Sequence, residues 1–195
     1  TAQITNKIMI IARTSKRENG NPTNGLSLFY TDFNRDSIEA RIINKMGRAA
    51  VDTNELFIDD LKAPIEDIIG EEGKGFSYLI HSLNPERILV AAEAYGIAKN
   101  ALERAVNYAN ERSVFDRLIG KNQSIQHPLA EAWAKLESVK LLILKAANLY
   151  DNNKSCGVEA NAAKFLAAEY GMEICKQAIA THGGMGYAKE YHVER

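Results

Sequence analysis

Residues 180–187, which read ATHGGMGY, are the most informative stretch of this 195-residue chain. They follow a long alanine-rich segment with helical spacing, and their glycines interrupt it. Glycine tolerates positive φ, and its lack of a side chain lets backbone N–H groups approach a phosphate closely. A Gly-Gly pair after a helix is also an ordinary C-cap. This stretch therefore predicts a helix end and, as an open alternative, a phosphate contact.

Upstream of this break, the apolar residues are spaced at about 3.6 from Phe76 onward, which predicts three long helices. Alanine dominates, which lets helices approach closely in an antiparallel bundle. Pro128 indicates that the second helix starts near His127 or bends there. The three apolar stripes are Ile88, Ala92, Tyr95, Ala98, Leu102, Ala105 and Ala109; Ile125, Leu129, Ala132, Leu136, Val139, Ile143, Ala146 and Tyr150; and Val158, Ala162, Phe165, Met172, Cys175 and Ile179.

The first part of the chain carries strand signals. Short apolar runs predict strands at residues 7–13, 26–30, 38–43 and 55–58, with a hairpin loop at residues 15–24 between the first two. About four short strands are too few for a sheet with two buried faces. We therefore expect an α+β chain. Residues 1–74 would be the second half of a β-barrel-type domain, and residues 75–195 an antiparallel α-helical bundle.

Composition excludes several classes of function. The net charge is -1, so no basic field attracts nucleic acid or an anionic membrane. Apolar runs such as Leu141 to Leu144 are too short to span a bilayer, and we expect no signal peptide. Cys156 and Cys175 lack metal-ligand spacing, which indicates reduced thiols in a cytoplasmic protein and no metal site. The chain has no initial Met and ends after a loop, so we expect it to be part of a longer protein.

Three ordered motifs carry a resemblance to a known family. They are residues 82–88 (SLNPERI), residues 108–123 (YANERSVF followed by DRLIGKNQ) and residues 182–187 (HGGMGY). Residues 57–64 and 73–76 add weaker matches. Together they resemble the acyl-CoA dehydrogenases. The resemblance implies the later part of a middle β domain followed by most of a C-terminal helical domain that lacks its end.

The resemblance also implies an activity. Such an enzyme oxidises an acyl-CoA thioester to a trans-2-enoyl-CoA: a carboxylate removes the α-proton, and the β-hydrogen leaves as hydride to FAD. Electrons then pass to an electron-transfer flavoprotein, in the cytoplasm or, in a eukaryote, the mitochondrial matrix. The alternatives are an acyl-CoA oxidase or flavin monooxygenase of the same fold, or a non-catalytic helical oligomerisation module. We expect residues 1–195 alone to bind FAD weakly or not at all.

The resemblance places the catalytic base at Glu86, with Asn84 and Arg87 facing the acyl-CoA. In most of the family the base lies in a later stretch, so a residue beyond Arg195 is the alternative. Glu86 also follows Asn84-Pro85, a pattern typical of a helix start, where an acid is favoured by the helix dipole. Plain capping is therefore the competing interpretation of Glu86.

The cofactor residues implied by the resemblance act on the FAD of a neighbouring subunit. Arg112 would hold the pyrophosphate, because guanidinium makes bidentate phosphate contacts. An ordinary surface charge for Arg112 and a core position for Phe115 are the alternatives. The chain is then expected to form a homodimer or a dimer of dimers. The remaining implied cofactor residues are Ser113, Phe115, Gln123, His182, Gly183 and Gly184.

Two residues depart from the family pattern. Asp116 stands where glycine usually follows the phenylalanine, and Ala180 stands where a glutamine is frequent. Both put the cofactor contacts in doubt, although not the fold.

Of the other conspicuous residues, Trp133 is expected in the core. His81 and His127 have no partners at metal-ligand spacing.

Overall fold

The computed structural model describes residues 1–17 and 21–195. Within them the chain divides into two compact units, Thr1–Ser82 and Leu83–Arg195. The middle of the predicted hairpin loop, residues 18–20, lies outside the described residues. The first unit contains strands and the second contains most of the helical residues, so the α+β class is confirmed.

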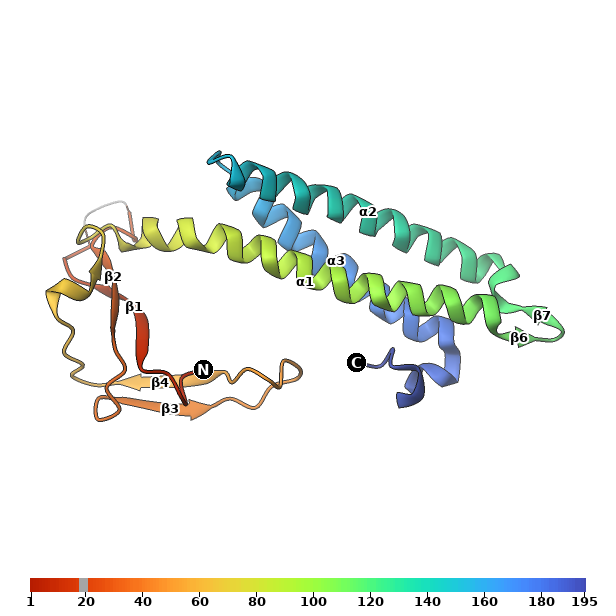
Figure 1. The fold of residues 1–195 in the computed structure, drawn as a ribbon, viewed down its shortest axis with the longest axis horizontal. Helices are drawn as coiled ribbons and strands as arrows, with labels where there is room; N and C mark the ends of the chain where they lie inside the picture. Colours follow the sequence, from red (N-terminus) through yellow and green to blue (C-terminus); the bar gives the residue numbers. More distant parts are fainter. Residues whose placement is uncertain (18–20) are drawn as a thin grey trace. The chain divides into compact units, whose positions relative to one another are not determined.

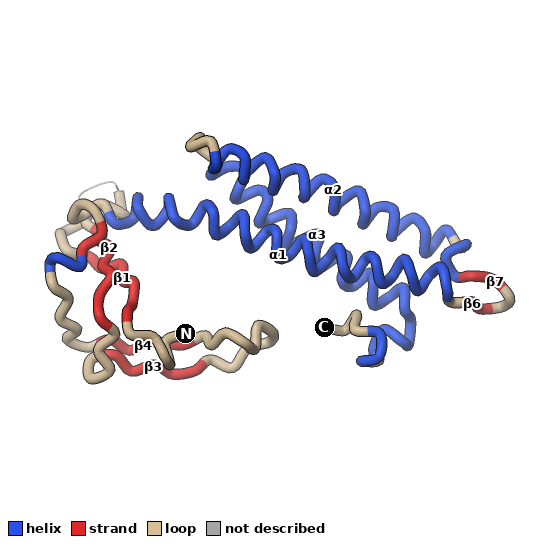
Figure 2. The backbone as a smooth tube through the Cα atoms, in the orientation of Figure 1, coloured by secondary structure: helices blue, strands red, loops and turns tan. Residues whose placement is uncertain are grey.

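The first unit is built from two small antiparallel sheets (Figure 2). In one, β1 (Lys7–Arg13) pairs with β2 (Leu26–Asp32), which pairs in turn with β5 (Ile68–Ile69). In the other, β3 (Ile38–Ile42) pairs with β4 (Asn54–Ile58). The four predicted strands are present. Strand β5 was not predicted, because two residues are too few to show a period.

One face of the β1–β2 pair is apolar and open. Met9 lies opposite Tyr30 across the pair, and their side chains are 53% and 51% exposed. Phe57 of β4 is also exposed. The opposite face of β2 carries the buried Ser27 and Thr31, and Leu28, next to Tyr30 on the apolar face, is buried as well. The sheets of this unit therefore leave apolar surface uncovered.

The helical part consists of α1 (Gly75–Glu111), α2 (Gln123–Asp151) and α3 (Gly157–His182) (Figure 1). A short hairpin of β6 (Ser113–Val114) and β7 (Arg117–Leu118) connects α1 to α2. This hairpin was not predicted. The 3₁₀ helices are η1 (Ile65–Asp67), η2 (Ile119–Lys121), η3 (Gly183–Tyr187) and η4 (Lys189–Tyr191).

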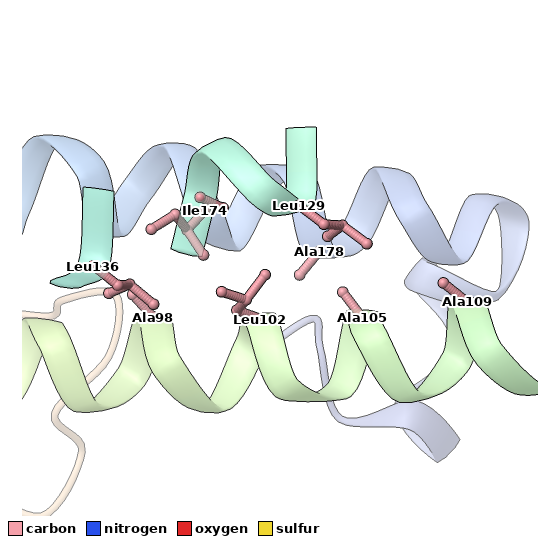
Figure 3. Close-up of a cluster of buried hydrophobic side chains, with 9 residues drawn as sticks. Ala98, Leu102, Ala105, Ala109, Leu129, Leu136, Ile174 and Ala178 are labelled. Atoms are coloured by element: carbon pink, nitrogen blue, oxygen red, sulfur yellow. The ribbon is translucent and has the colours of Figure 1, made fainter. Parts of the chain in front are cut away.

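Alanines and leucines fill the space between the three helices (Figure 3). Ala98 and Ala105 of α1 are fully buried, and Leu136 of α2 and Ile174 of α3 pack with them. Small residues permit close helix contact, so long helices pack with few large side chains. The first two predicted stripes therefore form this core, except that Ala92 and Tyr150 are exposed.

Both helix starts differ from expectation. Helix α1 begins at Gly75, so Pro85 lies well inside it and Glu86 is not in its first turn. The capping interpretation of Glu86 is therefore wrong. Helix α2 begins at Gln123 and carries Pro128 inside it, not at its start. The carbonyl of Asn122 accepts from the N–H groups of two residues of its first turn, which fixes that turn ahead of the proline.

The predicted stripe of α3 is wrong, because its large residues lie on the outer face and only Ala162 and Cys175 are half-buried. Val158 is 80% exposed, Phe165 61% and Met172 56%. The buried face consists mainly of small residues, which let α3 lie close to its neighbours. Trp133, expected in the core, is 62% exposed. The buried residues of α3 are Ala160, Ala163, Ala167, Gly171, Ile174, Ala178, Thr181 and His182.

Both cysteines are free thiols, and burial raises the pKa of Cys175. Among residues 1–17 and 21–195, no group of three or more His, Cys, Asp or Glu side chains is arranged to hold a metal ion. In the same described ranges, no helix combines the length and apolarity needed to cross a membrane.

Candidate functional site

An open groove of about 530 Å³ lies where the end of α1, the start of α2 and the end of α3 meet. We call it the Arg112 groove. Arg112 lines it, and so do His182, Gly183 and Gly184, which follow about seventy residues later. Four of the predicted cofactor residues therefore share one wall. Ala180 also lines the groove, so the position where the family often has glutamine presents only a methyl group here.

Arg112 has a fixed backbone and an unengaged side chain. Its N–H donates to the carbonyl of Tyr108 at 2.8 Å, and its own carbonyl accepts from Ile119 N–H at 2.9 Å. Within the described part of the chain, its guanidinium makes no hydrogen bond or ion pair, and Arg112 is exposed. A positioned cation that has no partner among the described residues is available for an anionic ligand.

The hairpin after Arg112 projects an aromatic ring. Phe115 is 98% exposed, so the alternative of a core position is wrong. Phe115 and Asp116 occupy the turn with φ values of 51° and 56°, as a tight two-residue hairpin turn requires. Aspartate tolerates this conformation better than most residues. Asp116 can therefore replace glycine without changing the turn, and it does not line the groove.

The glycine turn consists of three residues with different constraints. Gly183 caps α3, with φ 58° and ψ −135°, a conformation accessible almost only to glycine, and its N–H donates to Ala180 O. Gly186 is required sterically, because a Cβ there would lie 2.4 Å from Ile179 O. Gly184 has neither constraint: φ is not positive, and a Cβ would meet nothing within 4 Å. The C-cap interpretation thus explains Gly183 but not Gly184.

Three aromatic rings join the segments around the groove. His182, at the end of α3, is 4% exposed and stacks on Tyr108 with ring centroids 4.3 Å apart. Tyr191 meets both rings edge-on. The Nδ1 atom of His182 lies 2.8 Å from Ala178 O, and a carbonyl only accepts, so Nδ1 carries the proton. Sequence reasoning missed Tyr108 and Tyr191, whose partners are distant in sequence.

Three predicted cofactor residues lie beside the groove and not in its wall. Ser113 and Phe115 belong to the β6–β7 hairpin, whose Val114 lines the groove. Gln123 begins α2 and is exposed, and the neighbouring Ser124 lines the groove. These side chains are accessible to a ligand that extends beyond the groove.

The predicted catalytic cluster lies elsewhere on α1. Glu86 is exposed, and Arg87 Nη1 donates to Asn84 Oδ1 at 3.1 Å. Arg112 follows Glu86 by twenty-six residues, which corresponds to about 39 Å of helix. The two groups of predicted site residues are therefore far apart along α1.

Comparison with known proteins identifies the family. Residues 73–195 match the family described as acyl-CoA dehydrogenase, C-terminal domain. The chain belongs to the acyl-CoA dehydrogenase family. It is 40% identical over 182 residues to caffeyl-CoA reductase-Etf complex subunit CarC of Acetobacterium woodii, covering 93% of this chain and 48% of that protein. It is 37% identical to a 3-(aryl)acrylate reductase of Clostridium sporogenes, covering 100% of this chain and 51% of that protein.

Solved structures agree with this assignment. Butyryl-CoA dehydrogenase from Megasphaera elsdenii superposes with a TM-score of 0.89 at 34% identity, covering 97% of this chain and 49% of that one. A glutaryl-CoA dehydrogenase in complex with glutaryl-CoA superposes with a TM-score of 0.88 at 32% identity, covering 100% of this chain and 49% of that one. The chain spans about half the length of the relatives it matches.

Proposed function

We propose that this chain is part of an FAD-dependent enzyme that acts on the α,β carbon–carbon bond of an acyl-CoA thioester. The Arg112 groove would receive the ADP portion of FAD held by a neighbouring subunit. The observation that carries this proposal is the convergence of unpartnered Arg112 and the Gly183–Gly184 turn on one groove. Residues 1–74 would belong to the middle β domain and residues 75–195 to the C-terminal helical domain.

The residues present fit a diphosphate. Arg112 supplies a guanidinium with unused donors, and Gly184 leaves open space where a side chain would otherwise stand. Ser113, Phe115 and Gln123 are exposed beside the groove and could contact the remainder of the cofactor. Ala180 cannot hydrogen-bond, so this groove would depend more on Arg112 than a groove with glutamine at that position.

Glu86 is the proposed catalytic base, with Asn84 and Arg87 facing the acyl-CoA. Its capping alternative is excluded by the start of α1 at Gly75. The Arg87–Asn84 hydrogen bond holds the neighbouring side chains one turn apart on the same helix. The carboxylate would take the α-proton, while bound FAD supplies the hydride acceptor. A carboxylate beyond Arg195 remains the competing base.

The relatives differ in the direction of the reaction for which they are named. Two of the relatives are described as reductases, one of caffeyl-CoA within an Etf complex and one of aryl acrylates. Others are described as dehydrogenases, including cyclohexane-1-carbonyl-CoA dehydrogenase of Geobacter metallireducens. We propose dehydrogenation of an acyl-CoA to a trans-2-enoyl-CoA. Reduction of the same double bond is the second candidate, favoured by the caffeyl-CoA relative.

The proposed partners are an electron-transfer flavoprotein and a second copy of the chain, in the cytoplasm. The exposed α3 face supports self-association. Its four large residues, Val158, Phe165, Met172 and Ile179, are spaced by seven. In an antiparallel pair of α3 helices, Val158 would meet Ile179 and Phe165 would meet Met172. Such a surface can pair with itself about a two-fold axis.

Spectroscopy of the intact protein tests this function. The purified protein should show a flavin absorbance band that an acyl-CoA bleaches under anaerobic conditions. Reoxidation by an enoyl-CoA would measure the reverse direction on the same sample. A colourless, fully folded intact protein that neither binds FAD nor responds to acyl-CoA would support the non-catalytic helical module instead.

A further inference from the structure

His182 is the one histidine in the described residues that is buried: His81, His127 and His192 are exposed. It lies directly before Gly183, at the end of α3. Its ring therefore sits next to the glycine turn but is 4% exposed. Such a ring offers a ligand little surface, which argues against His182 as a principal direct contact to the cofactor.

The contacts of His182 instead connect the glycine turn to Arg112, the two segments that share this wall of the Arg112 groove. The imidazole stacks on Tyr108 at 4.3 Å with an interplanar angle of 24°. The carbonyl of the same Tyr108 accepts the N–H of Arg112 at 2.8 Å. The chain of contacts therefore runs from the glycine turn through His182 and Tyr108 to the backbone of Arg112.

Two further contacts hold the imidazole in place. Nδ1–H donates to Ala178 O at 2.8 Å, which fixes the rotation of the ring and its tautomer. Tyr191 packs edge-on against it at 5.6 Å, and Arg104 Nη1 donates to the carbonyl of Tyr191 at 3.3 Å. The ring is thus held by α1, α3 and the segment after η3.

We propose that His182 is a positioning residue, which sets the separation between Arg112 and the Gly183–Gly184 turn so that both reach one diphosphate. This inference rests on the proposed nucleotide function of the groove. Stacking carries the connection to Tyr108, and the Nδ1 hydrogen bond sets the ring orientation. A phenylalanine would keep the stacking and lose the hydrogen bond, whereas an alanine would lose both.

The first test uses the 195-residue chain without ligand. The amide resonance of Arg112 reports its hydrogen bond to Tyr108. His182→Ala should shift this resonance, although the two residues are distant in sequence, and His182→Phe should leave it close to wild type. His127→Ala removes an exposed imidazole outside the groove wall and is the matched control. An unchanged Arg112 resonance in His182→Ala overturns the proposal.

The second test titrates ADP into the same variants made in the intact protein, after its bound FAD has been removed. His182→Ala should weaken ADP binding by about tenfold, a scale set by loss of one well-placed interaction, and His182→Phe by less than about threefold. In the Arg112→Ala background, His182→Ala should add little, because its effect acts through Arg112. Fully additive effects would indicate a merely structural role and overturn the proposal.

The outcomes separate this inference from the function on which it rests. If wild type does not bind ADP, or Arg112→Ala binds it as wild type does, the nucleotide function of the groove is wrong. The Arg112 resonance still decides whether His182 sets the geometry. If Arg112→Ala weakens ADP and His182→Ala does not, the function stands and the role of His182 is wrong.

Discussion

The two ends of α1 differ in how much of a site this chain supplies. At the Arg112 end, the hairpin, the start of α2 and the glycine turn surround a groove. At the Glu86 end, one exposed carboxylate stands beside a single Arg87–Asn84 hydrogen bond. The first end is assembled within the chain. At the second, the described residues show an exposed carboxylate and no enclosing pocket.

Because of this difference, only one of the two ends of α1 can be tested on residues 1–195 alone. The geometry of the Arg112 end can be tested on residues 1–195, because all its walls belong to the second compact unit. A general base in this chemistry needs an apolar pocket that raises its carboxyl pKa. Exposed Glu86 lacks such a pocket here, so its role can be tested only in the intact enzyme.

The largest expected effect is at the Glu86 end. Glu86→Gln in the intact enzyme should lower turnover by at least ~100-fold while FAD and substrate still bind, because the amide cannot accept the α-proton. Stopped-flow reduction of the flavin by acyl-CoA measures the step directly. Glu103→Gln, on the same helix and in a weak pair with Lys99, is the matched control. Turnover within a few-fold of wild type would assign the base to a residue beyond Arg195.

The next largest effect is expected on self-association of the chain through the exposed face of α3. Phe165→Glu places a charge at the centre of the exposed α3 face and should weaken self-association by at least ~30-fold, the scale of one hot-spot residue. The wild-type helical part should be at least a dimer that buries roughly 2,000 Å² or more. Sedimentation at micromolar concentration measures both.

Ser155→Glu introduces the same charge in the loop between α2 and α3 and should leave the assembly unchanged. A monomeric wild type would contradict the proposed assembly and remove the reason for Arg112 to act on a neighbour's cofactor. A dimer that tolerates Phe165→Glu would place the interface on another face, for example around exposed Trp133.

The wrong prediction for α3 shows that periodicity alone does not identify the buried face of a helix. Both faces of α3 carry apolar residues, so a period near 3.6 fits either face. The large residues were placed inside, whereas the structure buries alanines and Gly171 because they allow close helix contact. The stripe of α2 was predicted correctly except for Tyr150, because its large residues are the buried ones, although Trp133, Leu141 and Leu144 outside the stripe are exposed. Which face of each helix is buried therefore depends on the residues of both faces, and not on the period alone.

The sequence predicted some residues of the Arg112 groove but not the groove itself. Arg112 and the glycine turn were singled out separately, and the fold brings them to one wall. The Tyr108–His182 stack could not be predicted, since it depends on how α1 packs against α3. The type of turn at Phe115 and Asp116 was also not predicted, because a phenylalanine rarely adopts positive φ and the pair contains no glycine.

A smaller effect is expected at the Arg112 end. Arg112→Ala should weaken FAD binding to the intact enzyme by about tenfold, because a charge-assisted contact to phosphate is lost. The dimer should remain intact, since the guanidinium has no partner in the described part of its own chain. FAD release measured by fluorescence gives the affinity, and sedimentation gives the assembly. Lys140→Ala, an exposed cation on α2, is the control. Dissociation of the dimer would show that Arg112 contacts protein instead of phosphate.

The smallest effects separate the two glycines of the turn. Gly183→Ala should lower the free energy of unfolding by about 1 kcal/mol, because alanine is strained at φ 58° and ψ −135°. Gly184→Ala should change it by less than about 0.5 kcal/mol, as expected for a surface substitution, since its Cβ meets nothing within 4 Å. Urea unfolding of both variants measures the difference.

Gly184→Ala should nevertheless weaken ADP binding, by about threefold, because the added methyl group stands where the ligand would approach the backbone. Gly47→Ala, also free of contacts but in the first unit at φ 84°, controls for strain without a nearby ligand. If Gly184→Ala is neutral for both stability and ADP affinity, then the ligand does not approach this backbone. Arg112 would then bind the diphosphate without help from the backbone of the glycine turn.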